Sequence, residues 1–124
     1  MDVTVIDRPQ DDAIVLALSG QLDVDAAPRL QREVDALVRR REPRIVADLA
    51  ALEFCDSTGL SAFVVAERAC TGSGGWLRLA APTAFLTRVL QVVGLLDRLP
   101  VYRDVPAALS GDPAGLVPAP PQPD

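Results

Sequence analysis

The chain has 124 residues, 49% of them hydrophobic, which is enough for one domain with a hydrophobic core. Its net charge of −5 argues against a nucleic-acid-binding domain, which usually has a basic face. It contains no histidine and no lysine, which excludes Ser-His-Asp and Cys-His catalysis, histidine-containing zinc sites and phosphohistidine transfer. Without a secretion leader or an apolar run of about 18 residues, the chain is expected in the cytoplasm with no membrane span, its two cysteines reduced.

The N-terminal third predicts a hairpin and then a helix. Residues 3–7 alternate weakly and residues 13–19 form a strong apolar run, so we expect two antiparallel strands joined at Asp11-Asp12. Residues 20–25 are expected to form a loop, with Asp25 as the N-cap of a helix over about Ala26 to Arg40. The buried stripe of this helix is predicted at Leu30, Val34, Leu37 and Val38.

The middle of the chain predicts a buried strand that leads into a second helix. Residues 45–51 are nearly all apolar, as in a strand covered on both faces. Asp56-Ser57-Thr58-Gly59 ends this run, and a helix is expected over about Ser57 to Cys70. The Ser57 hydroxyl then lies at the positive end of a helix, which favours a phosphate. From its spacing alone, Ser57 is more simply read as only the N-cap of that helix. Asp56 is expected to favour the helix dipole as well as to belong to the site.

Several residues near this junction have two interpretations. Ser61, Ala62 and Val65 are expected on the outer side of the second helix, where they form either a partner surface or an ordinary flank. Asp23 is expected at the same end of the sheet, as a site residue or a turn residue. Asp48 is expected to form a hydrogen bond with nearby backbone rather than to take part in chemistry. Cys55 and Cys70 are expected to be small core residues rather than redox sensors.

The remaining elements complete an alternating pattern. We expect a strand at Trp76–Ala80, a helix that starts at Pro82-Thr83 and ends at Gly94, a short strand over 99–102 and a short helix over 105–109. This order predicts an α/β fold with a mixed sheet of about five strands, an N-terminal hairpin and helices packed on the sheet. Residues 1–109 are expected to form the domain, and residues 110–124 a Pro-rich disordered tail.

Four ordered motifs resemble the STAS domain family, and within it the bacterial anti-sigma factor antagonists, also called anti-anti-sigma factors. They cover about residues 3–109 and are Leu18-Ser19-Gly20-Gln21-Leu22-Asp23, Ala26-Ala27-Pro28-Arg29-Leu30, Asp56-Ser57-Thr58-Gly59-Leu60 and Gly75-Trp76-Leu77-Arg78-Leu79. Four positions depart from the family pattern. Gln21 replaces a common Glu, Cys55 an aliphatic residue and Trp76 a polar residue, and Thr58 replaces the second Ser of the motif, which is a frequent variant. These departures leave the presumed acceptor Ser57 untouched and put the identity of the partner in doubt.

The resemblance implies a STAS-type domain that regulates transcription by partner switching and is not an enzyme. In this family the unphosphorylated antagonist binds an anti-sigma factor with GHKL-type serine kinase activity and so releases a sigma factor. The kinase uses ATP to phosphorylate the serine, here Ser57, and a PP2C-type phosphatase removes the phosphate, so the domain needs no cofactor. The implied surroundings of the phosphorylation site are Asp23, Asp56, Thr58, Gly59, Ser61, Ala62 and Val65.

Two other functions remain open from the sequence. The chain could be a STAS subunit of a membrane transporter complex, such as a lipid-transport assembly, that docks through the same helix face. An enzyme such as an NTP hydrolase using Ser57 or the aspartates is disfavoured by the absence of histidine and lysine.

Overall fold

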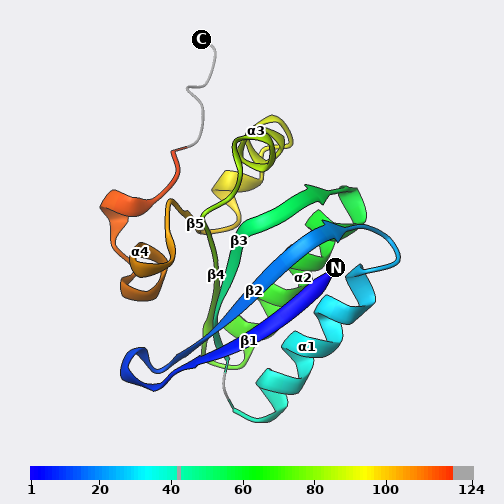
Figure 1. The fold of residues 1–124 in the computed structure, drawn as a ribbon. Coiled ribbons are helices and arrows are strands. Elements are labelled where there is room, and N and C mark those ends of the chain that lie inside the picture. The colour runs from blue at the N-terminus through cyan, green and yellow to red at the C-terminus, as the bar shows by residue number, and fades with distance from the viewer. Residues whose placement is uncertain (42, 119–124) are drawn as a thin grey trace.

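A five-stranded sheet in the order β1-β2-β3-β4-β5 forms the centre of the computed structural model, which describes residues 1–41 and 43–118 (Figure 1). β1 (Asp2–Arg8) pairs antiparallel with β2 (Ala13–Leu22). β3 (Arg44–Cys55), β4 (Trp76–Ala80) and β5 (Val101–Tyr102) continue the sheet with parallel pairing. The predicted α/β fold with a mixed sheet and an N-terminal hairpin is therefore confirmed.

In the described part of the chain, four α-helices pack on this sheet and three short 3-10 helices lie at turns. The α-helices are α1 (Ala27–Arg39), α2 (Ser57–Gly72), α3 (Ala84–Val92) and α4 (Val105–Ser110). The 3-10 helices span Pro9–Asp11, Leu95–Asp97 and Pro113–Gly115. α1 and α2 lie on one side of the sheet and α4 lies on the other (Figure 1).

β3 is the central strand, and its sequence explains why. Both of its edges are paired, and most of its side chains between Ile45 and Leu52 are buried by the helices and neighbouring strands. Such a strand reads as a continuous apolar run rather than an alternating one. Asp48 interrupts the run, and its carboxylate accepts a hydrogen bond from the Ala50 N–H at 3.1 Å, as expected.

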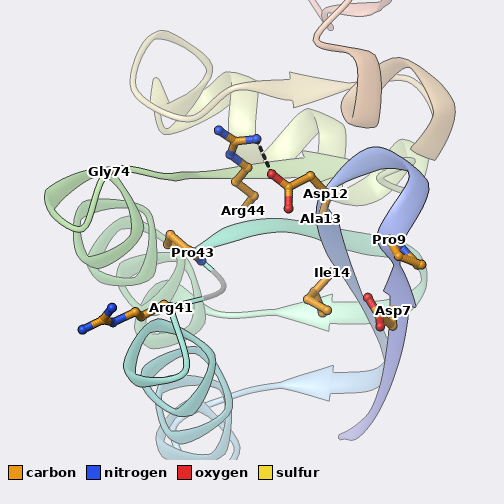
Figure 2. A pocket seen from close by; sticks show the side chains of 9 residues that line it. All are labelled: Asp7, Pro9, Asp12, Ala13, Ile14, Arg41, Pro43, Arg44 and Gly74. Carbon is orange, nitrogen blue, oxygen red and sulfur yellow. Dashed lines mark hydrogen bonds and ion pairs between the residues drawn. The ribbon is translucent and has the colours of Figure 1, made fainter.

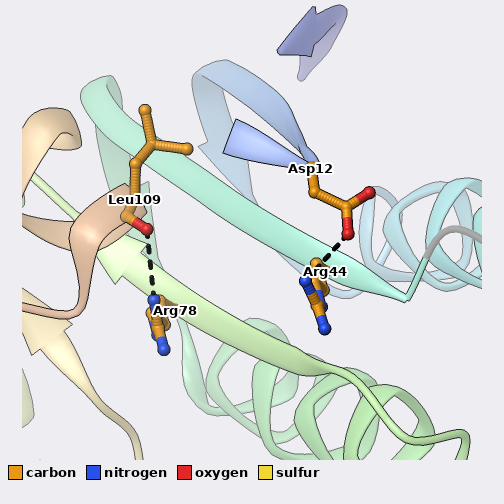
Figure 3. Close-up of polar contacts among 4 residues, drawn as sticks. All are labelled: Asp12, Arg44, Arg78 and Leu109. Carbon is orange, nitrogen blue, oxygen red and sulfur yellow. Dashed lines mark hydrogen bonds and ion pairs between the residues drawn. The ribbon is translucent and has the colours of Figure 1, made fainter. Parts of the chain in front are cut away.

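The second face of the sheet carries a smaller core, which holds α4. Val15, Val46 and Ala80 pack there with Tyr102 and Ala108. The guanidinium of Arg78 fixes the helix end, because Nη1 donates to the Ala108 carbonyl at 2.8 Å. The same Nη1 also reaches the Leu109 carbonyl at 3.5 Å (Figure 3). The same guanidinium lies 3.8 Å from the centre of the Trp76 ring.

The connection from β2 to α1 differs from the prediction. Residues 20–22, expected in a loop, belong to β2, because the strand continues to pair with β3 across two register shifts. Asp25 is not the N-cap of α1: Ala26 holds that position without a side-chain cap. The side chain of Asp23 instead binds the backbone just before the helix: its Oδ1 accepts hydrogen bonds from the N–H groups of Asp25 at 3.1 Å and Ala26 at 3.0 Å.

The predicted disordered tail is wrong for residues 110–117. Leu116 forms a β-bridge with Tyr102, and the Val117 N–H donates to the Val101 carbonyl at 2.8 Å. Val117 also packs against the main core. The packed domain therefore extends past residue 109, because an apolar Leu-Val pair within the Pro-rich segment returns to β5. Residues 119–124 of the predicted tail lie outside the described residues.

Candidate functional site

The parallel strands β2 and β3 end side by side, and this places two aspartates together. Leu22 and Cys55, the last residues of the two strands, are register partners. The next residue after each is an aspartate, Asp23 or Asp56, and the Asp56 N–H donates to the Leu22 carbonyl at 3.2 Å. The predicted proximity of Asp23 to the start of α2 follows from this pairing.

Asp56, not Ser57, is the N-cap of α2. Its Oδ1 accepts a hydrogen bond from the Gly59 N–H at 2.9 Å, and its carbonyl accepts the first helical bond, from the Leu60 N–H, at 2.9 Å. The N-cap interpretation of Ser57 is therefore wrong. An N-cap carboxylate satisfies one of the free N–H groups of the first turn and also interacts favourably with the helix dipole.

Ser57 is the first residue of α2, and both Ser57 and Thr58 are exposed. No hydrogen bond to the Ser57 hydroxyl occurs within residues 1–41 and 43–118. The hydroxyl is therefore open to solvent at the positive end of a 16-residue helix, next to a fixed carboxylate.

Gly59 has a packing role that its sequence position did not reveal. An added Cβ would lie 2.5 Å from the Leu22 carbonyl oxygen and 2.7 Å from the Cys55 Sγ. The residue is buried, so it cannot contact a partner directly as a surface residue would. Its missing side chain lets the first turn of α2 approach the end of β2, which is what positions Ser57.

The exposed side of α2 continues from Ser57 along one stripe. Ser61 and Val65 follow at intervals of four residues, both exposed as predicted, and Val65 is 52% exposed. Ala62, expected on the same outer side, is 5% exposed, so that prediction is wrong. Ala62 lies where α1 packs against α2, since Gln31 Nε2 of α1 donates to the Ala62 carbonyl at 2.9 Å.

Two exposed apolar residues beside the aspartates were not among the predicted site residues. Val24, between Asp23 and Asp25, is 61% exposed, and Phe54, just before the end of β3, is 42% exposed. Exposed apolar side chains mark an interaction surface where they form one contiguous patch, whereas single ones are common on any protein surface. The sequence signal was available, since Val24 stands between two aspartates in a polar connection.

Cys55 and Cys70 are core residues, as the sequence favoured. Both are buried and neither forms a disulfide. Burial, together with the nearby Asp56 carboxylate, raises the pKa of the Cys55 thiol to about 12. Burial, with smaller effects from Glu67 and Asp35, raises the pKa of Cys70 to about 11. Both side chains therefore remain neutral thiols at physiological pH, which is unsuitable for a reactive cysteine.

A pocket of the described residues lies at the other end of the sheet. It has a volume of about 420 Å³ and lies between the β1–β2 turn and the loops before β3 and β4 (Figure 2). Two of its lining residues form an exposed ion pair, with Arg44 Nη1 at 2.8 Å from Asp12 Oδ2 (Figure 2). Because the 12-residue β3 separates Arg44 from Cys55, on the order of 30 Å of strand lies between this pocket and Ser57.

The described residues add neither a membrane-spanning helix nor a metal site to this surface. Among the described residues, no helix is both long and apolar enough to span a bilayer. The same part of the chain holds no cluster of three or more His, Cys, Asp or Glu side chains suited to a metal ion. The residues at the junction of β3 and α2 thus offer an exposed hydroxyl, carboxylates and apolar contacts.

Comparisons with known proteins agree with this architecture. The chain is 28% identical to the anti-sigma F factor antagonist of Paenibacillus polymyxa over 98 residues, which are 78% of this chain and 84% of the relative. It is 28% identical to the anti-sigma-B factor antagonist of Bacillus subtilis (strain 168) over 97 residues, 78% and 88% of the two chains. The crystal structure of an anti-sigma factor antagonist from Mycobacterium paratuberculosis superposes with a TM-score of 0.78 at 28% identity, covering 89% of this chain and 92% of that one.

A family model described as "Mlab, STAS domain" matches residues 7–101. That range begins in β1, ends in β5 and includes the whole junction between β3 and α2. The match spans most of the chain and agrees with the observed order of strands and helices, so this protein belongs to the STAS domain family.

Proposed function

We propose that this protein is an anti-sigma factor antagonist whose partner binding is switched off by phosphorylation of Ser57. The observation that carries the proposal is the exposed Ser57 hydroxyl, held at the first position of α2 beside the Asp56 cap and without a hydrogen bond among the described residues. Such a hydroxyl is accessible to a kinase. Two relatives that match most of the chain are named as anti-sigma factor antagonists, which supports a binding rather than a catalytic role.

The local charges explain how one phosphate would break a complex. A phosphoserine carries about −1.5 to −2 charges at pH 7, and Asp56 and Asp23 already place two carboxylates near it. The helix N-terminus tolerates the phosphate within the protein. A partner surface fitted to a neutral hydroxyl meets like charges and desolvated groups instead. A loss of about 3 kcal/mol weakens binding more than a hundredfold.

The proposed binding surface combines the α2 stripe with the apolar residues beside the aspartates. Ser57, Ser61 and Val65 form the stripe, and Val24 and Phe54 provide exposed apolar area at its N-terminal end. The proposed partners are an anti-sigma factor with GHKL-type serine kinase activity and a PP2C-type phosphatase, both acting in the cytoplasm. The antagonist itself contributes the acceptor and the docking surface, and ATP is bound by the kinase.

The test compares Ser57→Ala and Ser57→Asp as baits in native lysate, with the captured proteins identified by mass. Ser73→Asp is the matched control, because it adds the same charge at an exposed position at the other end of α2. We expect Ser57→Ala and Ser73→Asp to retain a GHKL-type kinase and Ser57→Asp to lose it. Equal capture by both Ser57 variants would contradict the proposed switch.

A second measurement asks directly for the modification. The captured kinase, ATP and the wild-type chain are incubated, and the phosphorylated peptide is located by mass spectrometry. The proposal predicts a single phosphate on Ser57 and none on Ser57→Ala. Phosphate on Thr58 or Ser61, which are also exposed, would show that Ser57 is not the acceptor, although the phosphate would still lie on the proposed binding surface.

The alternative function is a STAS subunit of a membrane transporter complex. The matching family model names Mlab together with STAS and does not mention a sigma factor, so it does not separate the two functions. Co-purification with an ATPase and a permease, unaffected by Ser57→Asp, would favour the transporter subunit over the antagonist.

A further inference from the structure

β1 is an edge strand of the sheet, and one of its two edges is unpaired. Six of its seven residues are exposed, and in the described part of the chain it pairs only with β2. Its outer edge therefore presents a row of N–H and C=O groups to solvent, a template for another strand. The opposite edge of the sheet is partly covered, because Leu116 forms a β-bridge with Tyr102 of β5.

This edge strand also exposes apolar side chains on both faces. Ile6 is 42% exposed and pairs with Val15, on the face of the sheet that carries the smaller core. Val5 is 48% exposed and pairs with Leu16, on the face covered by α1 and α2. β1 contains no proline, and its charged side chains lie at its ends, at Asp2, Asp7 and Arg8, so that residues 3–6 of the edge are uncharged.

We propose that β1 pairs antiparallel with β1 of a second copy of this chain, so that two sheets join into one of ten strands. Symmetric pairing of residues 2–8 places Val5 opposite Val5 of the second copy, on the two-fold axis. Thr4 then lies opposite Ile6. Asp2 lies opposite Arg8 at both ends, which gives two ion pairs of opposite charge across the junction.

The charges of the strand select this register. A shift by one residue in one direction places Asp2 opposite Asp7, and like charges directly opposite each other destabilise a sheet. A shift in the other direction leaves Asp2 outside the pairing and places Arg8 opposite Val3. Only the register centred on Val5 pairs all seven residues of β1 and matches both terminal charges.

The two-fold symmetry leaves both Ser57 surfaces open. Asp2 pairs with Ser19 near the carboxyl end of β2, the end where α2 begins, whereas Arg8 pairs with Ala13 at the other end. Antiparallel pairing of the two copies therefore places their Ser57 residues at opposite ends of the joined sheet. The dimer would present two antagonist surfaces at once, and its formation does not depend on the function proposed above.

Analytical ultracentrifugation of the untagged chain tests the proposal. The wild-type chain of 13.2 kDa is expected to reach twice that mass, with a Kd below about 1 mM. Asp2→Arg places two arginines opposite each other and is expected to weaken the dimer about tenfold or more. The double variant Asp2→Arg/Arg8→Asp restores opposite charges at both ends and should recover the wild-type Kd.

Controls separate the interface from damage to the fold. Arg8 also pairs with Asp11 within the chain, at 3.4 Å, so thermal unfolding of each variant must be measured beside its mass. Arg32→Asp changes an exposed arginine on α1 and is expected to leave the Kd unchanged. A wild-type chain that stays monomeric at about 1 mM, or a dimer indifferent to Asp2→Arg, would overturn the proposal.

Discussion

Replacing Gly59 with alanine should destabilise the junction between the end of β2 and the start of α2. The added methyl group would meet the Leu22 carbonyl oxygen at 2.5 Å and two further atoms at 2.7 and 2.8 Å. The nearest of these is a backbone atom in a paired strand, which cannot rotate away as a flexible side chain can. In an open helix position the same change would stabilise by up to about 1 kcal/mol, so the steric cost has to exceed that gain.

The expected net loss is about 1–3 kcal/mol, the usual range for overpacking a buried site. With an unfolding entropy of about 2.1 cal/mol/K per residue, a chain of 124 residues loses roughly 4 °C of Tm for each kcal/mol. Differential scanning calorimetry should therefore show a decrease of about 4–11 °C. Because α2 must shift to accept the methyl group, binding of the proposed partner to the Ser57 surface should weaken as well.

Gly72→Ala is the matched control on the same helix. Gly72 is the last residue of α2, and an added Cβ at this position has no atom within 4 Å. Alanine there should be neutral or stabilise by up to about 1 kcal/mol. If Gly59→Ala were as stable as Gly72→Ala, the close approach of α2 to β2 would not be the reason for a glycine in this motif.

Three further predictions concern the cap, the thiols and the α4 contact. Asp56→Ala should cost about 1 kcal/mol of stability in urea unfolding and Asp56→Asn much less, because asparagine also caps helices well; equal losses would argue against a capping role. The raised pKa values of Cys55 and Cys70, about 12 and 11 against 9.0 unfolded, mean that the folded chain holds these protons more tightly. The free energy of unfolding should therefore be unaffected well below pH 9 and fall as the pH rises through 9, with a smaller slope in Cys55→Ala. Arg78→Ala should lose about 2 kcal/mol and shift the fluorescence of Trp76, whereas an unchanged spectrum would contradict the ring contact.

The elements with a strong periodic pattern were predictable from the sequence. The apolar run at residues 45–51 and the polar break at Asp56 located β3 and the start of α2, because burial on both faces and helix capping each have a local signature. The errors occurred where a tertiary contact decided the structure. Leu116 and Val117 belong to the domain only because they reach β5, and a Pro-rich composition does not reveal such a contact.

The site was predictable at the level of position but not of environment. The exposed Ser57 and Val65 followed from the helical period, but Ala62 was misplaced because the buried face of α2 is wider than one stripe where α1 crosses it. The division of roles between Asp56 and Ser57 depended on which residue adopts the extended backbone of an N-cap, since both side chains can fill that position. The steric role of Gly59 required the position of the Leu22 carbonyl, on a strand more than thirty residues away.

A charge placed on Ser57 should change partner binding without changing the fold. Ser57→Asp adds a carboxylate at the first position of α2, where the helix dipole favours it by about 0.3–1 kcal/mol. Repulsion from the Asp56 cap, whose carboxylate is fixed on the Gly59 N–H at 2.9 Å, opposes this gain by a similar amount. The Tm of Ser57→Asp should therefore lie within about 4 °C of that of the uncharged control Ser57→Asn, and amide NMR shifts should be confined to the ends of β2 and β3 and the first turn of α2. Shifts that spread through the sheet to α4, or a large loss of stability, would mean that a phosphate acts by rearranging the domain, and the proposed mechanism of local charge repulsion at the interface would be wrong.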